Sequence, residues 1–169
     1  GIYNPFSVLN TFDSGEFKGY WFETGTPSFL VKIMKDTSYD ISRLSGDEVG
    51  STLLSDVDSA FANPVPFLYQ AGYLTIKDYD KEYKLYKVGF PNKEVKDGFL
   101  NYLLNFYAPV QSESTNALIS RMSRDIRSGS AKGFMQKLEA LFAKTSYQIQ
   151  GDAEKNFQYA MYIILELMG

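Results

Sequence analysis

The sequence contains no cysteine and no histidine among its 169 residues. Without cysteine, a thiol nucleophile and a disulfide framework are excluded within these residues, and Cys/His zinc sites are excluded as well. A Ser-His-Asp triad is excluded too, because its general base is a histidine. A large part of the catalytic repertoire of proteins is therefore closed to this chain.

Long hydrophobic runs and a strong charge of one sign are also lacking. The formal net charge is −3, which predicts no general attraction to nucleic acid or to an anionic membrane. No apolar run reaches the roughly 18–20 residues of a membrane span, and the sequence contains no signal peptide. We therefore expect a cytoplasmic protein without a membrane partner.

Aromatic side chains are abundant, with 13 tyrosines and 13 phenylalanines in a chain that is 44% hydrophobic. This composition predicts a globular protein with a ring-rich core, either one domain or two small ones. The chain opens on Gly1, and residues 159–169 are almost wholly apolar. Because native termini are seldom so apolar, we expect the chain to be a fragment of a longer protein.

The stretch Asn63–Asn92 predicts a short helix that leads into a β-hairpin. The helix ends at Gly72, and two strands over residues 73–76 and 83–88 are joined by a polar bend over residues 77–82. Both strands carry apolar residues on both faces, so the hairpin is expected to pack on each side.

The segments before this stretch are less regular. A cap at Asn4 and Pro5 predicts a short helix through about Phe12, followed by an aromatic turn around residues 17–22. A second helix is expected from Thr26 to about Asp36. The weak pattern over residues 39–62 predicts one or two short strands or turns.

The segments after it are helical. Apolar residues recur at helical spacing after Asn92, and further helices are expected over about 112–127, from Ser130, and from Asp152. The last helix is apolar on both sides and is expected to be buried all round, covered by a missing C-terminal segment or a partner. The fold class is therefore α+β, mainly helical, with a helix and β-hairpin unit followed by a helical segment.

Two tripeptides match the E-x-K step of metal-dependent nucleases, in which a carboxylate binds a divalent metal and a lysine polarises the attacking water. They are Glu16 with Lys18 and Glu82 with Lys84. The chemistry also needs an acid on a neighbouring strand. The available acids are Asp13 and the pair Asp78 and Asp80, and all of them lie in turns, so solvated surface charge is the favoured interpretation.

Two further patterns have ordinary explanations. Asp78 and Asp80 could pair as metal carboxylates, but acids in a hairpin bend usually serve the turn. The segment over residues 46–52, GDEVGST, ends like a phosphate-binding loop but lacks the lysine that such a loop requires. We predict no catalytic, cofactor-binding or metal-binding residue within the chain.

Two sets of side chains could contact nucleic acid. Arg121, Arg124 and Arg127 recur every third residue and can share one stripe of a helix, where they could follow a phosphate backbone. Such a stripe is more often the solvated side of a helix. Tyrosines of the hairpin could stack on bases, although cross-strand packing is the more usual role; they are Tyr73, Tyr79, Tyr83 and Tyr86.

Four motifs closely resemble a bacterial family of AAA-ATPase-like proteins with a C-terminal PD-(D/E)XK nuclease-like domain. The motifs occur in the order of that family, span residues 3–95, and read YNPFSVLN (3–10), GYWFETGTP (19–27), LYQAGYLTI (68–76) and GFPNKEV (89–95). Residues 96–169 match more loosely.

The resemblance implies that this chain is the middle of such a protein. Residues 1–92 would form the C-terminal lid of the ATPase and a winged-helix-like unit, and residues 93–169 would lead into the nuclease-like domain. The nucleotide-binding motifs would then precede the chain and the nuclease residues would follow it, so ATP and Mg²⁺ are expected only for the parent protein.

The implied function is a non-catalytic linker that couples the ATPase to the nuclease-like domain. Its partners would be the missing domains and, through the parent, DNA or RNA. The alternative is a winged-helix nucleic-acid-binding module, and an intrinsic metal nuclease is a third reading.

Overall fold

The computed structural model describes residues 5–17, 20, 30, 32–34, 37, 39–56, 63–108, 115–145 and 153–169. The described part is mainly helical with one small antiparallel sheet, so the predicted fold class is confirmed. Two compact units divide the chain, Gly1–Gly98 and Phe99–Gly169. The boundary lies inside helix α5 (Lys93–Tyr107), six residues after the boundary that the resemblance implied.

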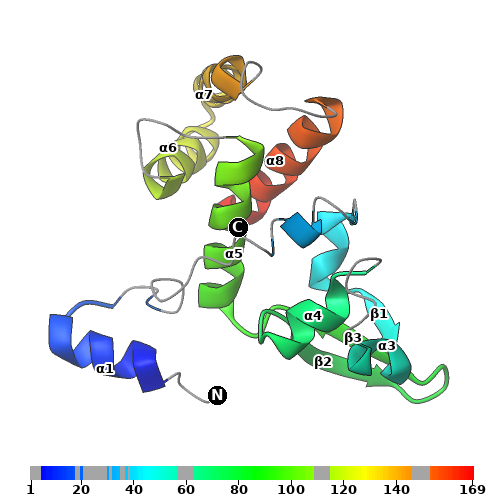
Figure 1. The fold of residues 1–169 in the computed structure, drawn as a ribbon. Coiled ribbons are helices and arrows are strands. Elements are labelled where there is room, and N and C mark those ends of the chain that lie inside the picture. Colours follow the sequence, from blue (N-terminus) through cyan, green and yellow to red (C-terminus); the bar gives the residue numbers. More distant parts are fainter. Residues whose placement is uncertain are drawn as a thin grey trace. The chain divides into compact units, whose positions relative to one another are not determined.

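The first unit holds all three strands, β1 (Glu48–Gly50), β2 (Thr75–Asp80) and β3 (Leu85–Gly89), in the order β1-β3-β2. Both pairings are antiparallel, with Val49 opposite Tyr86 and Tyr86 opposite Tyr79. Helices α3 (Ser51–Ser55) and α4 (Val65–Gln70) lie beside the sheet (Figure 1). The core of this unit comes from several elements; its buried residues include Ile41, Leu44, Val49, Leu54, Val65, Leu68, Leu74 and Val88.

Helix α4 has both of its ends fixed by local chemistry. Just before the helix, the side-chain oxygen of Asn63 accepts the amide of Val65 at 3.0 Å in an Asx turn that leads the chain into α4. At the other end Gly72 adopts a φ of 81°, and the amides of Gly72 and Tyr73 donate to the carbonyl oxygens of Tyr69 and Leu68. Glycine adopts this left-handed conformation without steric cost, so it ends the helix and directs the chain into β2.

The hairpin is present, but its turn is shorter and lies later in the chain than the sequence predicts, because β2 continues to Asp80 and β3 begins at Leu85 instead of residue 83. The predicted bend over residues 77–82 shortens to residues 81–84, because Lys77–Asp80 belong to β2. One oxygen of Asp80 accepts the amides of Glu82 and Tyr83 at 2.8 and 2.9 Å, which closes the turn tightly. Lys84 completes it in the left-handed region, with a φ of 55°.

The weakly patterned region before α4 contains a third strand that pairs with the hairpin. A 3₁₀ helix, η1 (Ile41–Ser45), precedes β1, and Asp40 caps it by accepting the amide of Ser42 at 3.0 Å. Helix α3 then follows β1 directly. The expected strand is therefore present at three residues, the short helices were not expected, and the prediction for residues 57–62 falls outside the described residues.

The first helix, α1 (Pro5–Ser14), confirms the predicted helix near the N-terminus. Tyr20, from the predicted aromatic turn, is buried, and its hydroxyl donates to the carbonyl oxygen of Glu16 at 2.9 Å. Of the second predicted helix, Leu30 and residues 32–34 are described as helical, and the remainder falls outside the described residues.

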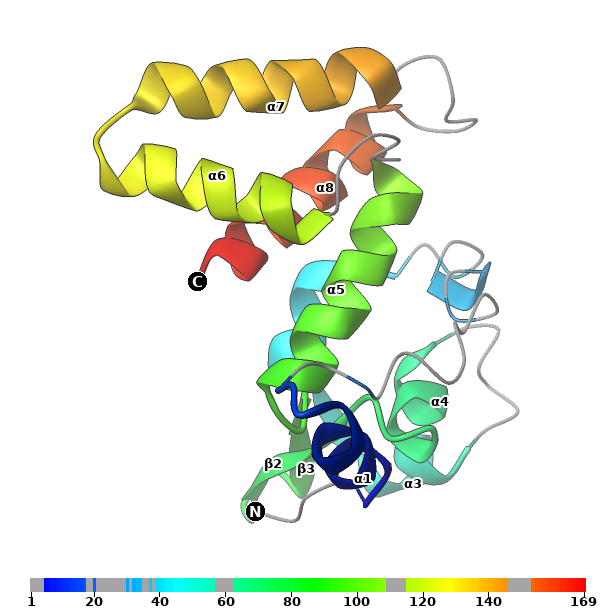
Figure 2. The ribbon, with the colours of Figure 1, turned by 90° about the vertical axis from the view of Figure 1, so that its left-hand side faces the viewer.

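The second unit consists of the end of α5 with α6 (Thr115–Arg127), α7 (Ala131–Thr145) and α8 (Ala153–Met168). Helix α6 packs against both α7 and α8 (Figure 2). The turn between α6 and α7 uses Gly129 at a φ of 74°, and Ser130 caps α7 through the amide of Gly133. The core is aliphatic and aromatic, and it includes Leu103, Leu104, Tyr107, Ile119, Met122, Phe134, Leu138, Ile163 and Ile164.

Helix α8 is predicted to be buried all round with a missing segment or a partner as part of its cover, and this stays a prediction. Ala160, Ile163 and Ile164 are buried, but Phe157 and Leu165 are 44% and 52% exposed. The inner side therefore faces the unit's core, while on the more exposed side Phe157 packs against Phe142 of α7 with ring centroids 4.3 Å apart.

Candidate functional site

The structure places the described residues of the nuclease-like tripeptides at exposed positions outside any strand. Glu82 and Lys84 both lie in the exposed hairpin turn, and Asp80 is engaged by backbone amides of that same turn. Glu16 is exposed just after α1, and Lys18 falls outside the described residues. The partner strand β3 has the sequence LYKVG and contains no acidic residue. Asp80, at the end of β2, is paired there with Leu85.

The side chains of Asp78 and Asp80 accept hydrogen bonds from backbone amides. Asp78 accepts the amide of Tyr79 at 2.8 Å, and Asp80 accepts two amides of the turn. In the part of the chain that the structure describes, no group of three or more acidic side chains is placed to hold a metal ion. The interpretation of these acids as turn chemistry accounts for every contact that they make here.

The segment over residues 46–52 has no phosphate-binding geometry. Gly46 ends η1 at a φ of 140°, Glu48–Gly50 form strand β1, and Ser51 begins the short helix α3. A phosphate-binding loop needs a strand, then a wide loop, then a helix with a lysine. Here strand β1 occupies the place of the loop, so the similarity exists in the amino-acid sequence but not in the backbone structure.

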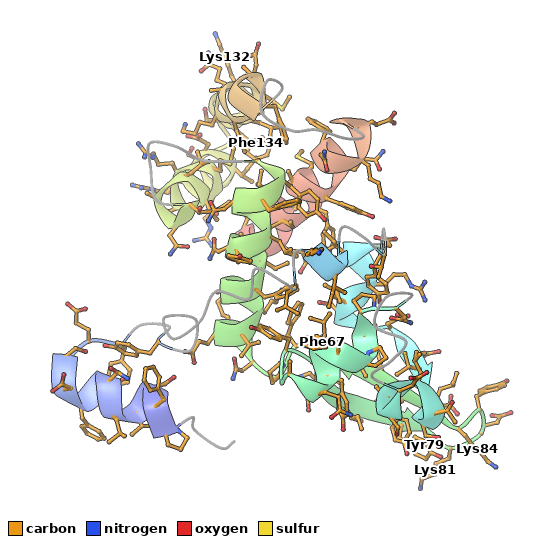
Figure 3. All side chains as sticks on the ribbon, in the orientation of Figure 1. Phe67, Tyr79, Lys81, Lys84, Lys132 and Phe134 are labelled. Atoms are coloured by element: carbon orange, nitrogen blue, oxygen red, sulfur yellow. The ribbon has the colours of Figure 1, made fainter. Side chains whose placement is uncertain are left out.

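The hairpin tyrosines separate into two environments. Tyr73 is buried in the core and is not available to a ligand. Tyr79 and Tyr86 pack against each other across the strands, with ring centroids 4.7 Å apart, as cross-strand packing predicts. Tyr83 is 69% exposed in the turn. Lys81 and Lys84 of the same turn lie at the end of the hairpin (Figure 3). One aromatic ring and two lysines therefore project at the tip of the hairpin.

Helix α4 precedes the hairpin and contains neither lysine nor arginine. Its sequence is VPFLYQ, and Val65, Pro66 and Leu68 are buried. Gln70 donates to the carbonyl oxygen of Leu54 at 3.0 Å, which fixes α4 to α3. Phe67 and Tyr69 are the partly exposed side chains of this helix. Its surface therefore consists of two partly exposed aromatic side chains and the exposed Gln70, and it carries no charge that could neutralise phosphate.

The three arginines of α6 do share the solvated side of the helix. Arg121, Arg124 and Arg127 are exposed, while Ile119 and Met122 face the core. Arg124 donates to the carbonyl oxygen of Ser120 at 3.3 Å. Asp125 also lies in this region, in an ion pair with Lys137 of α7. The stripe is therefore present, with one acid among its arginines.

A polar cluster around one buried carboxylate in the first unit was not foreseen from the sequence. The carboxylate of Asp47 is 7% exposed and accepts hydrogen bonds from Tyr39 at 2.5 Å and from Arg43 at 2.7 Å. Its backbone oxygen accepts the amide of Val88 at 2.9 Å. Burial and the bond to Asp47 raise the pKa of Tyr39, and the same carboxylate raises the pKa of Arg43. Every member has a partner, so the cluster holds η1 to the sheet.

The exposure of α1 was also not foreseen. Phe6, Leu9 and Phe12 are 40%, 68% and 83% exposed, and no residue of the helix is buried. The spacing predicted the helix correctly, but periodicity alone does not say which side faces the core. Large apolar side chains on the solvated side of a helix usually mark a contact surface.

Comparison with known proteins finds one relevant similarity. A protein of Azotobacter chroococcum mcd 1, named "Uncharacterized protein in vnfD 5'region", is 36% identical to this chain over 110 residues. The match covers 64% of this chain and 21% of that protein, so the chain spans about a fifth of the length of its relative. No family model matches the chain. No solved structure matches it either.

Among the described helices, none combines the length and the apolar character that a membrane crossing requires.

Proposed function

We propose that this chain is a non-catalytic coupling region of a longer, cytoplasmic AAA-ATPase-like protein, and that it links the ATPase to a nuclease-like domain. In this proposal ATP and Mg²⁺ bind to the parent protein, outside these residues. The similarity to a protein about five times as long as the matched segment supports membership of a larger polypeptide.

The observation that carries the proposal is the surface chemistry of the helix and hairpin unit. Helices beside a three-stranded sheet of order β1-β3-β2 support a winged-helix-like unit in Gly1–Gly98. In a nucleic-acid reader of that kind, the helix before the hairpin enters a groove and needs basic or polar side chains. Helix α4 instead presents Phe67 and Tyr69. Aromatic surfaces of this kind are typical of protein interfaces.

The test uses the full-length gene product. Tyr69→Ser should leave nucleotide binding unchanged and should weaken the response of the downstream domain to ATP at least about tenfold, since a loss of about 1.4 kcal/mol at an interface has that effect. Gln136→Ser, at an exposed position of α7, is the matched control and should change neither quantity. A full-length protein that binds no nucleotide would refute the parentage, and an unaltered response in Tyr69→Ser would refute the coupling.

The second candidate is a nucleic-acid-binding module, which is favoured by the exposed tip of the hairpin and by the arginines of α6. Tyr83 could stack on a base while Lys81 and Lys84 contact phosphates. Binding of this kind weakens steeply with salt, because neutralised phosphates release counterions.

Fluorescence anisotropy with duplex and single-stranded DNA at low and moderate salt separates the two candidates. The coupling proposal predicts no binding by the 169-residue chain even at low salt. Salt-dependent binding that is lost in Arg121→Glu/Arg124→Glu would assign the contact to α6. A loss confined to Lys81→Glu/Lys84→Glu would assign it to the hairpin tip.

A further inference from the structure

Strand β2 lies at an edge of the sheet, and its outer side is open. The strand order is β1-β3-β2, so within the described residues β2 pairs with β3 alone. Every residue of β2 after Thr75 is exposed, including the large side chains of Ile76 and Tyr79. An open edge presents unpaired amides and carbonyl oxygens, and these can pair with a further strand.

The backbone groups that point to this open edge belong to Ile76 and Tyr79. In an antiparallel sheet the amide and the carbonyl of one residue point to the same neighbouring strand, and successive residues alternate. The amide of Val88 in β3 donates to the backbone oxygen of Asp47 at 2.9 Å, on the side of β1. Val88 and Tyr86 therefore direct their backbone groups away from β2. Their partners in β2 are Ile76 and Tyr79, which direct their own groups outward.

The outward amide of Tyr79 is already occupied. A carboxylate oxygen of Asp78 accepts it at 2.8 Å. Hydrogen bonds to an ionised acceptor are stronger than those between neutral groups. A strand that paired with this edge would have to displace the carboxylate and place its own backbone oxygen beside a negative charge.

A β-bulge makes the edge irregular. Ile76 pairs with Val88 and Asp78 pairs with Lys87, so Lys77 is an extra residue in β2. The outward groups are therefore three residues apart, whereas in a regular strand they recur every second residue. A regular peptide strand is out of step with this spacing.

The same strand of a second copy does match it. In an antiparallel arrangement about a two-fold axis, Ile76 of each copy would lie opposite Tyr79 of the other. The spacing of three residues is then identical on both strands. Threonine, isoleucine and tyrosine also favour strand structure, so the sequence of β2 would support such pairing once the edge was clear.

We infer that Asp78 guards the edge of β2 against pairing with β2 of a second copy. The guard acts by holding the outward amide of Tyr79, which a second strand would need. This inference goes beyond the proposed coupling function and does not depend on it.

Three variants of the 169-residue chain separate the hydrogen bond from the charge. Asp78→Ala removes both the acceptor and the negative charge. Asp78→Asn removes the charge but keeps a side-chain oxygen that can accept the amide of Tyr79. Glu82→Ala, at an exposed position in the turn of the same hairpin, removes one negative charge and is the matched control.

Sedimentation velocity over a wide range of concentrations measures self-association. The dissociation constant of Asp78→Ala should be at least about tenfold lower than that of the wild type. Asp78→Asn and Glu82→Ala should stay close to the wild type. Equal dissociation constants for the wild type and Asp78→Ala overturn the inference. Association of Asp78→Asn or Glu82→Ala as tight as that of Asp78→Ala also overturns it, because charge and not the bond would then be the cause.

Amide hydrogen exchange locates the contact. In associated Asp78→Ala the amide of Ile76 should exchange more slowly than in the wild type, since it is then bonded to the second copy. Association that leaves the exchange of Ile76 unchanged overturns the inference.

A proline at the same position gives a second readout. Ile76→Pro added to Asp78→Ala should return self-association to the wild-type level, because proline lacks the outward amide and fits an edge strand where that amide faces solvent. Undiminished association in the folded double variant overturns the inference. If the double variant does not fold, the exchange of Ile76 in Asp78→Ala decides.

Discussion

At the scale of single residues, the most constrained group is the carboxylate of Asp47. Both of its oxygens accept a hydrogen bond, from Tyr39 and from Arg43, and its backbone oxygen binds the amide of Val88 in β3. A buried carboxylate is costly unless it is fully paired, and this one is. Since its partners come from the segment before η1, from η1 and from β3, one residue fixes three parts of the first unit.

The pH dependence of stability follows from Tyr39. Burial and the bond to Asp47 raise its pKa above the ordinary value of 10.0, so the folded state keeps a proton that the unfolded state releases. The contribution is fully present below pH 10.0 and is lost as the pH rises above it. Urea unfolding between pH 7 and 11.5 should therefore show a free energy of unfolding that falls in the alkaline range.

In Tyr39→Phe the alkaline fall should be shallower, and the stability at pH 7 should be about 1–2 kcal/mol lower because a buried hydrogen bond is lost. Burial also raises the pKa of Tyr107 in the second unit. In Tyr107→Phe the free energy of unfolding should therefore also fall less steeply with alkaline pH, and no bond to Asp47 is lost in this variant. Identical alkaline slopes in the wild type and both variants would show that the phenol groups do not carry this effect.

At the scale of elements, the hairpin turn is organised by one side chain. Asp80 accepts two backbone amides, whereas Asp78 accepts one from its immediate neighbour. Asp80→Ala should lower the free energy of unfolding by about 1 kcal/mol, and Asp78→Ala by less than about 0.5 kcal/mol. EDTA should leave the wild-type midpoint unchanged. If EDTA lowered the urea midpoint of unfolding of the wild type but not that of Asp80→Ala, the interpretation of Asp80 as a metal ligand would be restored.

Much of the element order could be predicted from the sequence. The helix that ends at Gly72, the hairpin and the helix after Asn92 follow from strong local signals. Strand β1 was only weakly indicated, because three residues are too few for a periodic pattern and its stability comes from pairing with β3. The hairpin turn was predicted to be too long, because the distribution of apolar residues does not reveal that Asp80 accepts two backbone amides and so closes a short turn.

The candidate surfaces were harder to predict than the elements. The sequence identified the arginine stripe of α6 and the hairpin tyrosines, but not the burial of Tyr73 or the exposure of the large apolar side chains of α1. Both depend on which side of an element meets the core. That choice is made by contacts between residues distant in sequence, such as the bond from Ser7 to Glu94, and no local pattern contains it.

At the scale of the whole molecule, helix α5 is shared by both compact units. Val95 is buried in the first unit, and Leu103 and Tyr107 are buried in the second. Phe99, the first residue of the second unit, is 1% exposed. Because one continuous helix supplies core residues to both, unfolding of either unit should destabilise the other.

Phe99→Ala should lower the free energy of unfolding by about 3–5 kcal/mol, as for other buried phenylalanines. Phe106→Ala, on the same helix but 36% exposed, should cost less than half as much. Hydrogen exchange should show that Phe99→Ala lowers the protection of β3 and of α7 together. A loss of protection in only one of them would mean that the units unfold independently.

The unbroken course of α5 through the unit boundary also restricts how this protein can change in evolution. Each residue added to an α-helix advances the following chain by about 1.5 Å and turns it by about 100°. An insertion of one or two residues near Gly98 would therefore rotate the buried Phe99, Leu103 and Tyr107 around the axis of α5 relative to Val95, whereas an insertion of seven would nearly restore their common side. Relatives that keep these buried residues on one side of the helix should differ in length here only in steps of about two helical turns.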